Sequence, residues 1–340
     1  MAMVSGPYGL PEDGDLSMTW FRHGGIPAFV LRRLLLGVLV LALVSVVVFI
    51  ATQALGDPAQ ALLGRDATPE RLAALRQELN LDVSPFEQYL NWLGGLMQGS
   101  LGDSLTTQRP VADLLSGRLV NSGVLVLCAA VVSIPLSIAL GSWAALRREK
   151  SVDTVSSNLM LVFASLPDFV VAVLLVIFFS TTVLHVLPAI SPVPPGQLPW
   201  NNPVILILPT VTLVMTVVPY IARNMRGSMI EVLESDFVEM ARLKGLPERV
   251  VLIRHALPNA IGPAFQSIAL SLAYLAGGIV VVEYAFNYPG IGSALKDAVA
   301  NHDVPVVQAL AMLIAAVYVV VNLLADIATI LVTPRLRTRL

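Results

Sequence analysis

The feature that most limits the fold of this chain is the stretch from Phe169 to Ala222, which contains no aspartate, glutamate, lysine or arginine. A helix needs roughly 20 apolar residues to cross the hydrocarbon of a bilayer, so this stretch is too long for one membrane span. A polar, proline-rich segment from Pro188 to Asn202 interrupts it. We therefore divide the stretch between the ends of two membrane helices.

Five further stretches lack the same four charged residue types: Leu34–Gly56, Leu119–Leu146, Thr154–Pro167, His255–Val282 and Val304–Ala325. Of the 340 residues, 56% are hydrophobic and 13% are charged, which is too little charge for the surface of a soluble domain. The predicted fold is an all-α, polytopic membrane protein with six transmembrane helices, at residues 30–55, 117–146, 154–186, 203–225, 260–283 and 305–332. The formal net charge of −2 offers no basic field for nucleic acid, so we expect none as a partner, and the single cysteine, Cys128, excludes a disulfide within the chain.

Lysine and arginine residues predict the orientation, because they are enriched in cytoplasmic loops. With both termini in the cytoplasm, fifteen of the 21 basic residues lie inside and six outside. Residues 1–28 contain glycine, proline and acidic residues and are predicted to be a disordered cytoplasmic tail, followed by a membrane domain over residues 29–340. Within that domain, residues 57–116 form an expected outer cap with short helices at 67–81, N-capped by Thr68, and at 85–97.

The longest inner loop, at residues 227–259, has a helical pattern. Asp236 and Glu239 suit the start of a helix that ends at Gly245, and a second helix is expected from Pro247 to Pro258. Such a pair of short helices suits a knob that seats in a groove of a partner protein. It also suits an amphipathic pair that lies on lipid, and the pattern alone does not choose between the two.

The spacing within this loop resembles a known family. Glu239-Met240-Ala241, three residues, Gly245, nine residues and then His255-Ala256-Leu257-Pro258 are similar to the EAA loop of ABC importer permeases, although Met240 replaces an alanine and His255 an isoleucine. The chain resembles more narrowly the dipeptide, oligopeptide and nickel branch of that family. Further matching elements are Gly56-Asp57-Pro58, Leu79-Asn80-Leu81-Asp82, Gly99–Ser104, Ser165–Phe169, Glu283–Phe286, Pro289–Gly292 and Asn322–Asp326.

The resemblance implies the type I permease fold and uptake of peptides through the cytoplasmic membrane of a prokaryote by alternating access. It implies a homologous second permease, two ATPase subunits that bind ATP and Mg²⁺, and an extracytoplasmic peptide-binding protein as partners, besides membrane lipid. The chain has no G-x-x-x-x-G-K-[ST] sequence to hold ATP phosphates, so we expect no cofactor and no enzymatic activity in it. The expected ATPase-coupling residues are Glu239, Met240, Ala241, Gly245, His255, Leu257 and Pro258.

A second group of residues is expected to serve the transport path. Asp168 lies roughly 22 Å along a helix from Asp153, and a charge at that depth faces a cavity or a partner group. It either attracts the cationic amine of a peptide, together with Asn121 and Ser165 along the path, or is held by a hydrogen bond from a neighbouring helix. Asp326 is expected to pack against a cytoplasmic arginine.

At the outer mouth, Glu283, Pro289 and Gly290 are candidates for the gate or for contact with the binding protein, whereas a solvated loop acid is the alternative for Glu283. We expect no metal site. Nickel transport is an alternative function because His185 and His302 both fall near the outer face, but two isolated histidines are a poor metal site. An ion-coupled secondary transporter is an alternative of another class, and it would require inverted repeats and several buried ionisable residues.

Overall fold

The computed structural model describes residues 25–64, 67–79, 81–194 and 196–332. These residues form helices joined by loops, with one isolated bridge between Asp103 and Pro110. The helices are α1 (Gly25–Gln53), α2 (Pro58–Leu63), α3 (Pro69–Glu78), α4 (Pro85–Met97), α5 (Val111–Leu146), α6 (Ser151–Ser165), α7 (Asp168–Val176), α8 (Val204–Leu233), α9 (Asp236–Leu243), α10 (Glu248–Val250), α11 (Leu257–Ala285), α12 (Ile291–Ala300) and α13 (Val304–Val332). Two π-helical segments, Ile177–Thr181 and Val251–Ala256, and a short 3₁₀ turn, Pro199–Asn201, complete the set.

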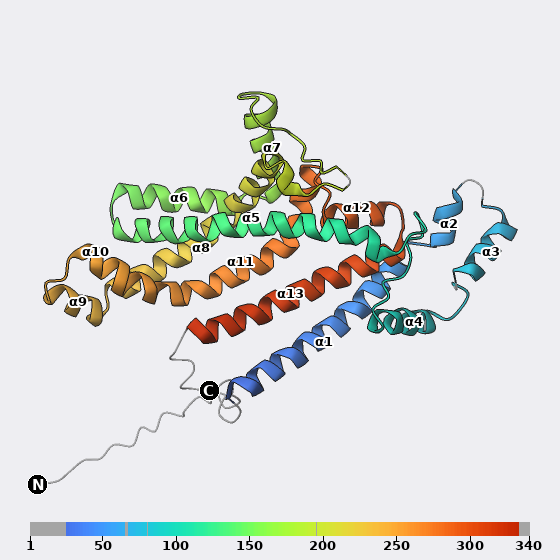
Figure 1. Ribbon diagram of the computed structural model, residues 1–340, viewed down its shortest axis with the longest axis horizontal. Coiled ribbons are helices and arrows are strands. Elements are labelled where there is room, and N and C mark those ends of the chain that lie inside the picture. The colour runs from blue at the N-terminus through green and yellow to red at the C-terminus, as the bar shows by residue number, and fades with distance from the viewer. Residues whose placement is uncertain (1–24, 65–66, 80, 195, 333–340) are drawn as a thin grey trace, which may run out of the picture.

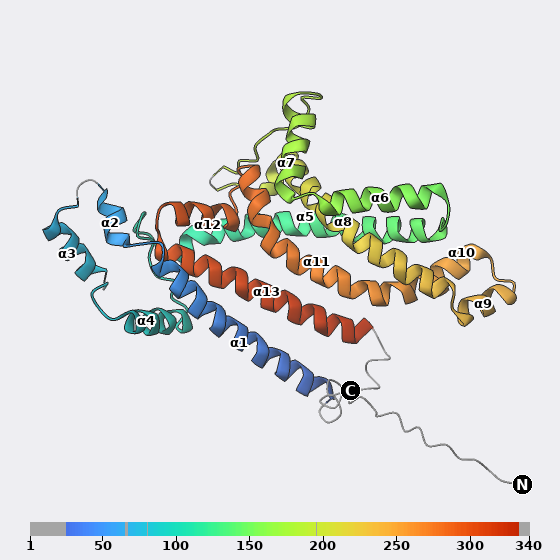
Figure 2. The same cartoon turned by 180° about the vertical axis from the view of Figure 1, so that it is seen from behind.

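The long helices α1, α5, α8, α11 and α13 extend between two ends of an elongated bundle, as Figures 1 and 2 both show. Helices α9 and α10 lie at one end, here called the α9 end. Helices α2, α3 and α4 lie at the other, the α4 end. Helices α1 and α13 run side by side, and α7 projects away from the bundle.

Four unbroken helices, α1, α5, α8 and α13, are long and apolar enough to cross a membrane, and two bent pairs bring the number of spans to six if each pair counts as one. The predicted all-helical membrane fold is therefore confirmed. Several boundaries differ: α1 begins at Gly25 and not at residue 30, and α8 continues to Leu233. The predicted disordered tail lies outside the described residues as far as residue 24.

The predicted third span is not one straight helix, because α6 and the helix that begins at Asp168 meet at an angle of 103°. Pro167 causes the break, since it has no N–H to continue the helix and disfavours the α conformation in the residue before it. Leu166 accordingly has an extended backbone with ψ of 130°. Of the prolines within the other predicted spans, Pro135, Pro209 and Pro219 lie inside continuous helices.

The expectation that Pro258 ends the second loop helix is wrong. The helix continues through Val251–Ala256 in π form and directly into α11, in which Pro258 occupies the first turn. Pro258 has no N–H to donate and lies where the π form gives way to the α form, so the helix lacks one hydrogen bond there without ending. The loop is thus joined to α11 without a break.

The most extensive contact between two helices joins α5 to α8. A Cβ atom on Gly141 of α5 would lie only 2.5 Å from the carbonyl oxygen of Ala222 on α8, so glycine is required for the two backbones to approach. Leu125, Leu213 and Leu275 continue this contact into a shared core between α5, α8 and α11. These three helices form the centre of the molecule.

At the α4 end, capping residues begin the two short helices that were expected there. The hydroxyl of Thr68 caps α3, as predicted, and Ser84 and Glu87 form a capping box that starts α4. Helix α2 was not predicted from the sequence. It is capped by Asp57, whose carboxylate also binds Arg76 of α3.

Candidate functional site

The loop at the α9 end turns sharply at Gly245. Gly245 has φ of 74°, a left-handed conformation that glycine adopts without steric cost, and its N–H donates to the carbonyl of Arg242. The predicted end of the first helix is therefore confirmed. Its start is not, because Ser235 occupies the N-cap position and Asp236 is the first helical residue.

An ion pair crosses this turn. The guanidinium of Arg242 donates to both carboxylate oxygens of Glu248, at 3.2 and 2.8 Å. These hydrogen bonds raise the pKa of Arg242 above its usual value. The pair links the first loop helix to the second at the surface of the loop, and it was not predicted from the sequence.

Inside the loop, Val238 and Ala241 pack against Val251 of the second helix. Ala241 is buried between the two loop helices. Its small side chain allows these helices to pack together. The expectation that it seats directly against a partner is thus not supported by its position.

The opposite face of α9 is open. Four exposed residues share one side of this helix, because they are spaced by three, one and three positions: Asp236, Glu239, Met240 and Leu243. Met240 is 54% and Leu243 is 74% exposed. We call these four residues the α9 stripe. It combines two carboxylates with two large apolar side chains, and Leu243 was missed because the motif draws attention to residues 239 and 241.

The remaining predicted coupling residues lie where the loop joins α11. His255 and Leu257 are half-buried and Pro258 is exposed. The carbonyl of His255 accepts a hydrogen bond from the Asn259 side chain at 2.7 Å. Leu257 packs against a core cluster that includes Met225 and Met229 of α8, so this end of the loop is anchored to the bundle.

Asp168 lies at the elbow between α6 and α7. The hydroxyl of Tyr274 on α11 donates to its carboxylate at 3.2 and 3.3 Å, which confirms the expected hydrogen bond from a neighbouring helix. Asp168 is half-buried, and Tyr274 is 48% exposed. Ser165 is exposed on the other side of the same elbow, with its hydroxyl bonded to the carbonyl of Val162 at 2.7 Å.

Glu283 is fully buried near the start of α12, so the alternative of a solvated loop acid is wrong. One carboxylate oxygen accepts the hydroxyl of Ser122 on α5 at 2.5 Å, and the other accepts the N–H groups of Gly292 and Ser293 at 2.7 and 3.2 Å. Ser122 also accepts the N–H of Ile291 at 2.9 Å. The carboxylate therefore joins α5, α11 and α12, and we call this arrangement the Glu283 clasp.

Asn121 belongs to the same region and not to the elbow of Asp168. Its side chain is buried, and the side-chain amide donates to the backbone carbonyl of Pro289 at 2.8 Å. The backbone carbonyl of Asn121 accepts a hydrogen bond from the Tyr288 hydroxyl at 2.7 Å. The expected role of Asn121 on an open path does not fit this position. A Cβ atom on Gly290 would overlap the carboxylate of Glu283, so Gly290 leaves the space that the clasp occupies.

A second buried carboxylate, Asp303, was not identified from the sequence. It accepts the Ser104 hydroxyl at 2.5 Å and the N–H groups of Leu105 and Thr106 at 3.1 and 3.3 Å. It thereby ties the start of α13 to the loop before α5. The sequence signal that could have identified Asp303 is its position directly before the apolar run that begins at Val304.

Two ion pairs fasten the helices nearer the α9 end. Arg226 on α8 binds the buried carboxylate of Asp153 on α6 through two hydrogen bonds of 2.7 and 2.6 Å. Asp326 on α13 lies 3.0 Å from the guanidinium of Arg33 on α1, which confirms its predicted packing against an arginine.

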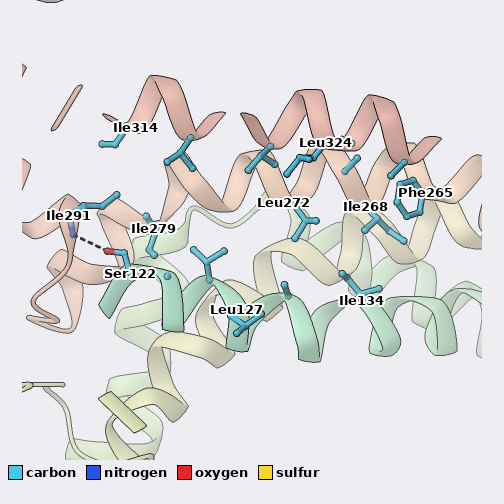
Figure 3. A pocket seen from close by; sticks show the side chains of 18 of the residues that line it. Ser122, Leu127, Ile134, Phe265, Ile268, Leu272, Ile279, Ile291, Ile314 and Leu324 are labelled. Carbon is cyan, nitrogen blue, oxygen red and sulfur yellow. Dashed lines mark hydrogen bonds between the residues drawn. The ribbon is translucent and has the colours of Figure 1, made fainter. Parts of the chain in front are cut away.

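An apolar groove of about 790 Å³ runs between α5, α11 and α13 (Figure 3). Its lining includes Leu127, Ile134, Phe265 and Leu272, and Ser122 is the one polar side chain among the lining residues. The Ser122 hydroxyl is occupied by Ile291 and Glu283. The described side chains that line the groove therefore offer apolar contacts and no free polar group for a peptide backbone.

The part of the chain that the structure describes contains no group of three or more His, Cys, Asp or Glu side chains able to hold a metal ion. The ring of His302 is instead engaged by the carbonyl of Leu55 at 2.8 Å.

A bundle of apolar helices with an exposed two-helix loop at one end has the architecture of the membrane subunit of an ATP-driven transporter. The model of the family "binding-protein-dependent transport system inner membrane component" matches residues 137–338, and the model of its N-terminal part matches residues 26–121. The chain belongs to this family of multi-pass inner-membrane permeases, which are transport subunits and not enzymes, and which work with ATPase and binding-protein partners.

Named relatives agree with this assignment. A probable peptide ABC transporter permease protein of Sinorhizobium fredii is 37% identical over 311 residues, which cover 91% of this chain and 99% of the relative. The glutathione transport system permease protein of Escherichia coli K12 is 34% identical over 310 residues, covering 91% of this chain and 98% of the relative. The glutathione permease of Salmonella choleraesuis is 33% identical over 310 residues.

Proposed function

We propose that this chain is the permease subunit through which an ATP-binding cassette importer moves dipeptides or oligopeptides across the cytoplasmic membrane of a prokaryote. The observation that carries the proposal is the loop at the α9 end, whose two helices are fixed by Gly245 and by the Arg242–Glu248 pair and which exposes the α9 stripe. The names of relatives that this chain matches over nine-tenths of its length support peptides as the substrate class.

The α9 stripe is the proposed seat of an ATPase subunit. Met240 and Leu243 would enter an apolar groove of the partner, while Asp236 and Glu239 would meet basic residues at its rim. The loop is continuous with α11 and follows directly from α8, so a displacement of the loop acts on both helices. In this way ATP binding by a partner would drive the change between inward and outward access.

The assembly proposed around this chain contains a homologous second permease, two ATPase subunits and an extracytoplasmic peptide-binding protein. ATP and Mg²⁺ would be held by the ATPase subunits, and this chain would carry no cofactor. The α9 end and both termini would face the cytoplasm. The α4 end, with the Glu283 clasp and the loop at Pro289 and Gly290, would face the binding protein.

Asp168 is the proposed contact for the substrate within the membrane. An ionised carboxylate inside a span is costly, and it is tolerated where it faces a cavity or a partner group. Tyr274 occupies part of its hydrogen-bonding capacity, and its half-buried position leaves the remainder open to a cation such as the amino terminus of a peptide. Ser165 adds a second exposed polar group at the same elbow.

The variant Gly245→Pro tests the coupling role of the loop. Proline requires φ near −65°, so it cannot adopt the φ of 74° found here, and the turn between the two loop helices should be lost. We expect the assembled complex to hydrolyse ATP but to take up no labelled peptide. Gly245→Asn is the matched control, because asparagine tolerates the left-handed conformation and should retain uptake. Normal uptake by Gly245→Pro would reject the assignment.

The substrate class is tested separately with the purified complex in proteoliposomes. Labelled di-, tri- and pentapeptides and nickel ions are offered with ATP, and with ATP absent. ATP-dependent accumulation of at least one peptide is expected. Accumulation of nickel without any peptide, or peptide uptake that needs an ion gradient and no ATP, would contradict the proposal.

A further inference from the structure

Helix α4 carries an unpartnered apolar stripe. Phe86, Leu90, Leu93 and Met97 are separated by four, three and four residues, which aligns them on one face of the helix. Phe86 is 69%, Leu90 is 48% and Met97 is 83% exposed, and Leu93 is partly exposed. Large apolar side chains exposed in a row indicate a surface that is covered by something other than water.

A second face of α4 fixes the helix against the end of α1. The rings of Tyr89 and Trp92 contact Phe49, with centroids 5.4 and 6.2 Å apart, and the Tyr89 hydroxyl lies 2.9 Å from the Ser45 hydroxyl. The side chains of Gln88 and Gln53 are joined at 3.1 Å. Eight residues of helix from Ser45 to Gln53 correspond to roughly 12 Å, so α4 crosses α1 over the last turns of that span.

The apolar stripe of α4 is continuous with the apolar surface of α1. Val46, Phe49 and Ile50 of α1 line a shared hollow of about 300 Å³ together with Pro85, Phe86 and Tyr89. Ile50 is 63% exposed, and so belongs to the surface that α1 presents as a membrane span. The surface that faces lipid along α1 therefore extends onto α4.

The third face of α4 is polar. Glu87 and Asn91 are exposed on the side of the helix away from the stripe, and the C-cap residue Gln98 is exposed as well. A helix with one apolar and one polar face, placed at the end of a span, has the character of a helix that lies in the bilayer interface. Tyr89 and Trp92 are of the residue types that are enriched at that depth.

We propose that α4 is an interfacial helix and that Phe86, Leu90 and Met97 are immersed in the acyl chains of the leaflet at the α4 end. In this position α4 holds the end of α1 at a fixed depth, through its contacts with Phe49 and Ser45. The bound partner of the stripe is thus lipid, and not the binding protein that delivers the substrate.

Spin labels on single cysteines test this inference. Labels are placed at 86, 90 and 97 on the stripe and at 87 and 91 on the polar face, in a Cys128→Ala chain assembled with its partner subunits in phospholipid nanodiscs. Collision rates are measured with oxygen, which concentrates in lipid, and with chromium oxalate, which stays in water. We expect a ratio of oxygen to chromium collisions at least fivefold higher for the stripe labels than for the polar-face labels.

Two results would overturn the inference. Stripe labels that collide freely with chromium oxalate, and lose this access when the binding protein is added, would assign the stripe to protein docking. Stripe labels shielded from both reagents would show that another subunit covers α4. Correct assembly of each labelled complex is checked by its ATP hydrolysis rate, so that an unfolded variant is not read as an exposed one.

Discussion

The buried carboxylate of Glu283 accepts a hydrogen bond from the hydroxyl of Ser122, although the two residues are 161 positions apart in the chain. The same carboxylate receives the first N–H groups of α12, so one side chain joins the end of α11, the interior of α5 and the beginning of α12. Glu283 therefore adds a polar tie to the apolar packing of Ile291, Ala294 and Ala298 that holds α12 in place.

Glu283→Ala should destabilise the protein and abolish uptake. Removing the carboxylate would leave the N–H groups of Gly292 and Ser293 without an acceptor, and a buried donor without a partner costs about 1–3 kcal/mol. We expect a fall of roughly 3 kcal/mol in the free energy of unfolding, seen as a lower melting temperature of the complex in detergent. Glu231→Ala, at an exposed position on α8, is the control and should leave the melting temperature unchanged. Equal melting temperatures for the two variants would contradict the role of the clasp.

Gly290→Ala should act in the same direction, because the added methyl group would overlap the Glu283 carboxylate. The loop must then move or the clasp must open, at a cost of roughly 1–3 kcal/mol for overpacking. Gly123→Ala is the matched control: nothing lies within 4 Å of its added methyl group, and alanine favours the helix. Peptide uptake and melting temperature are compared for the two variants. The prediction fails if Gly290→Ala behaves like Gly123→Ala.

The pair of Asp153 and Arg226 predicts a rescue experiment. Removing one partner of a fully buried ion pair costs about 3–5 kcal/mol, because the other charge is left without compensation, and the cost here should be smaller because the Arg226 side chain is 27% exposed. Asp153→Asn and Arg226→Gln should therefore each lower the melting temperature, and the double variant should be less destabilised than the sum of the two. The exposed pair of Lys296 and Asp297 is the control, and its loss should cost less than about 1 kcal/mol. Strict additivity at Asp153 and Arg226 would show that the pair is not coupled.

Asp168→Asn should reduce uptake of peptides with a free amino terminus and spare N-acetylated peptides. Loss of one partly solvated ion pair of about 1 kcal/mol corresponds to roughly a fivefold lower rate. Tyr274→Phe is the companion variant: it removes the neighbouring hydroxyl, retains the carboxylate and should preserve the preference for free amino termini. A uniform loss for both peptide types would indicate a structural role for Asp168 instead.

Local sequence signals predicted the helices well. Alternation of charged and uncharged stretches located α1, α5, α8, α11 and α13, and the N-cap Thr68 located α3. These predictions succeeded because membrane hydrocarbon accepts long apolar helices, and because a cap acts within one turn of its helix. The break before Asp168 was also encoded locally, by Pro167, but a single helix was predicted across it because no Asp, Glu, Lys or Arg interrupts the run from Thr154 to Pro167.

The site was only partly predictable. The sequence by itself determined the position of the loop and its turn, since glycine at residue 245 adopts a positive φ without steric cost. It did not determine which loop residues face outward, and only the structure showed Ala241 inside and Leu243 exposed. The burial of Glu283 was likewise decided by tertiary structure, because its partners come from α5 and α12. Burial and long-range hydrogen bonding depend on which helices become neighbours, and helix signals that act within a few residues carry no information about that choice.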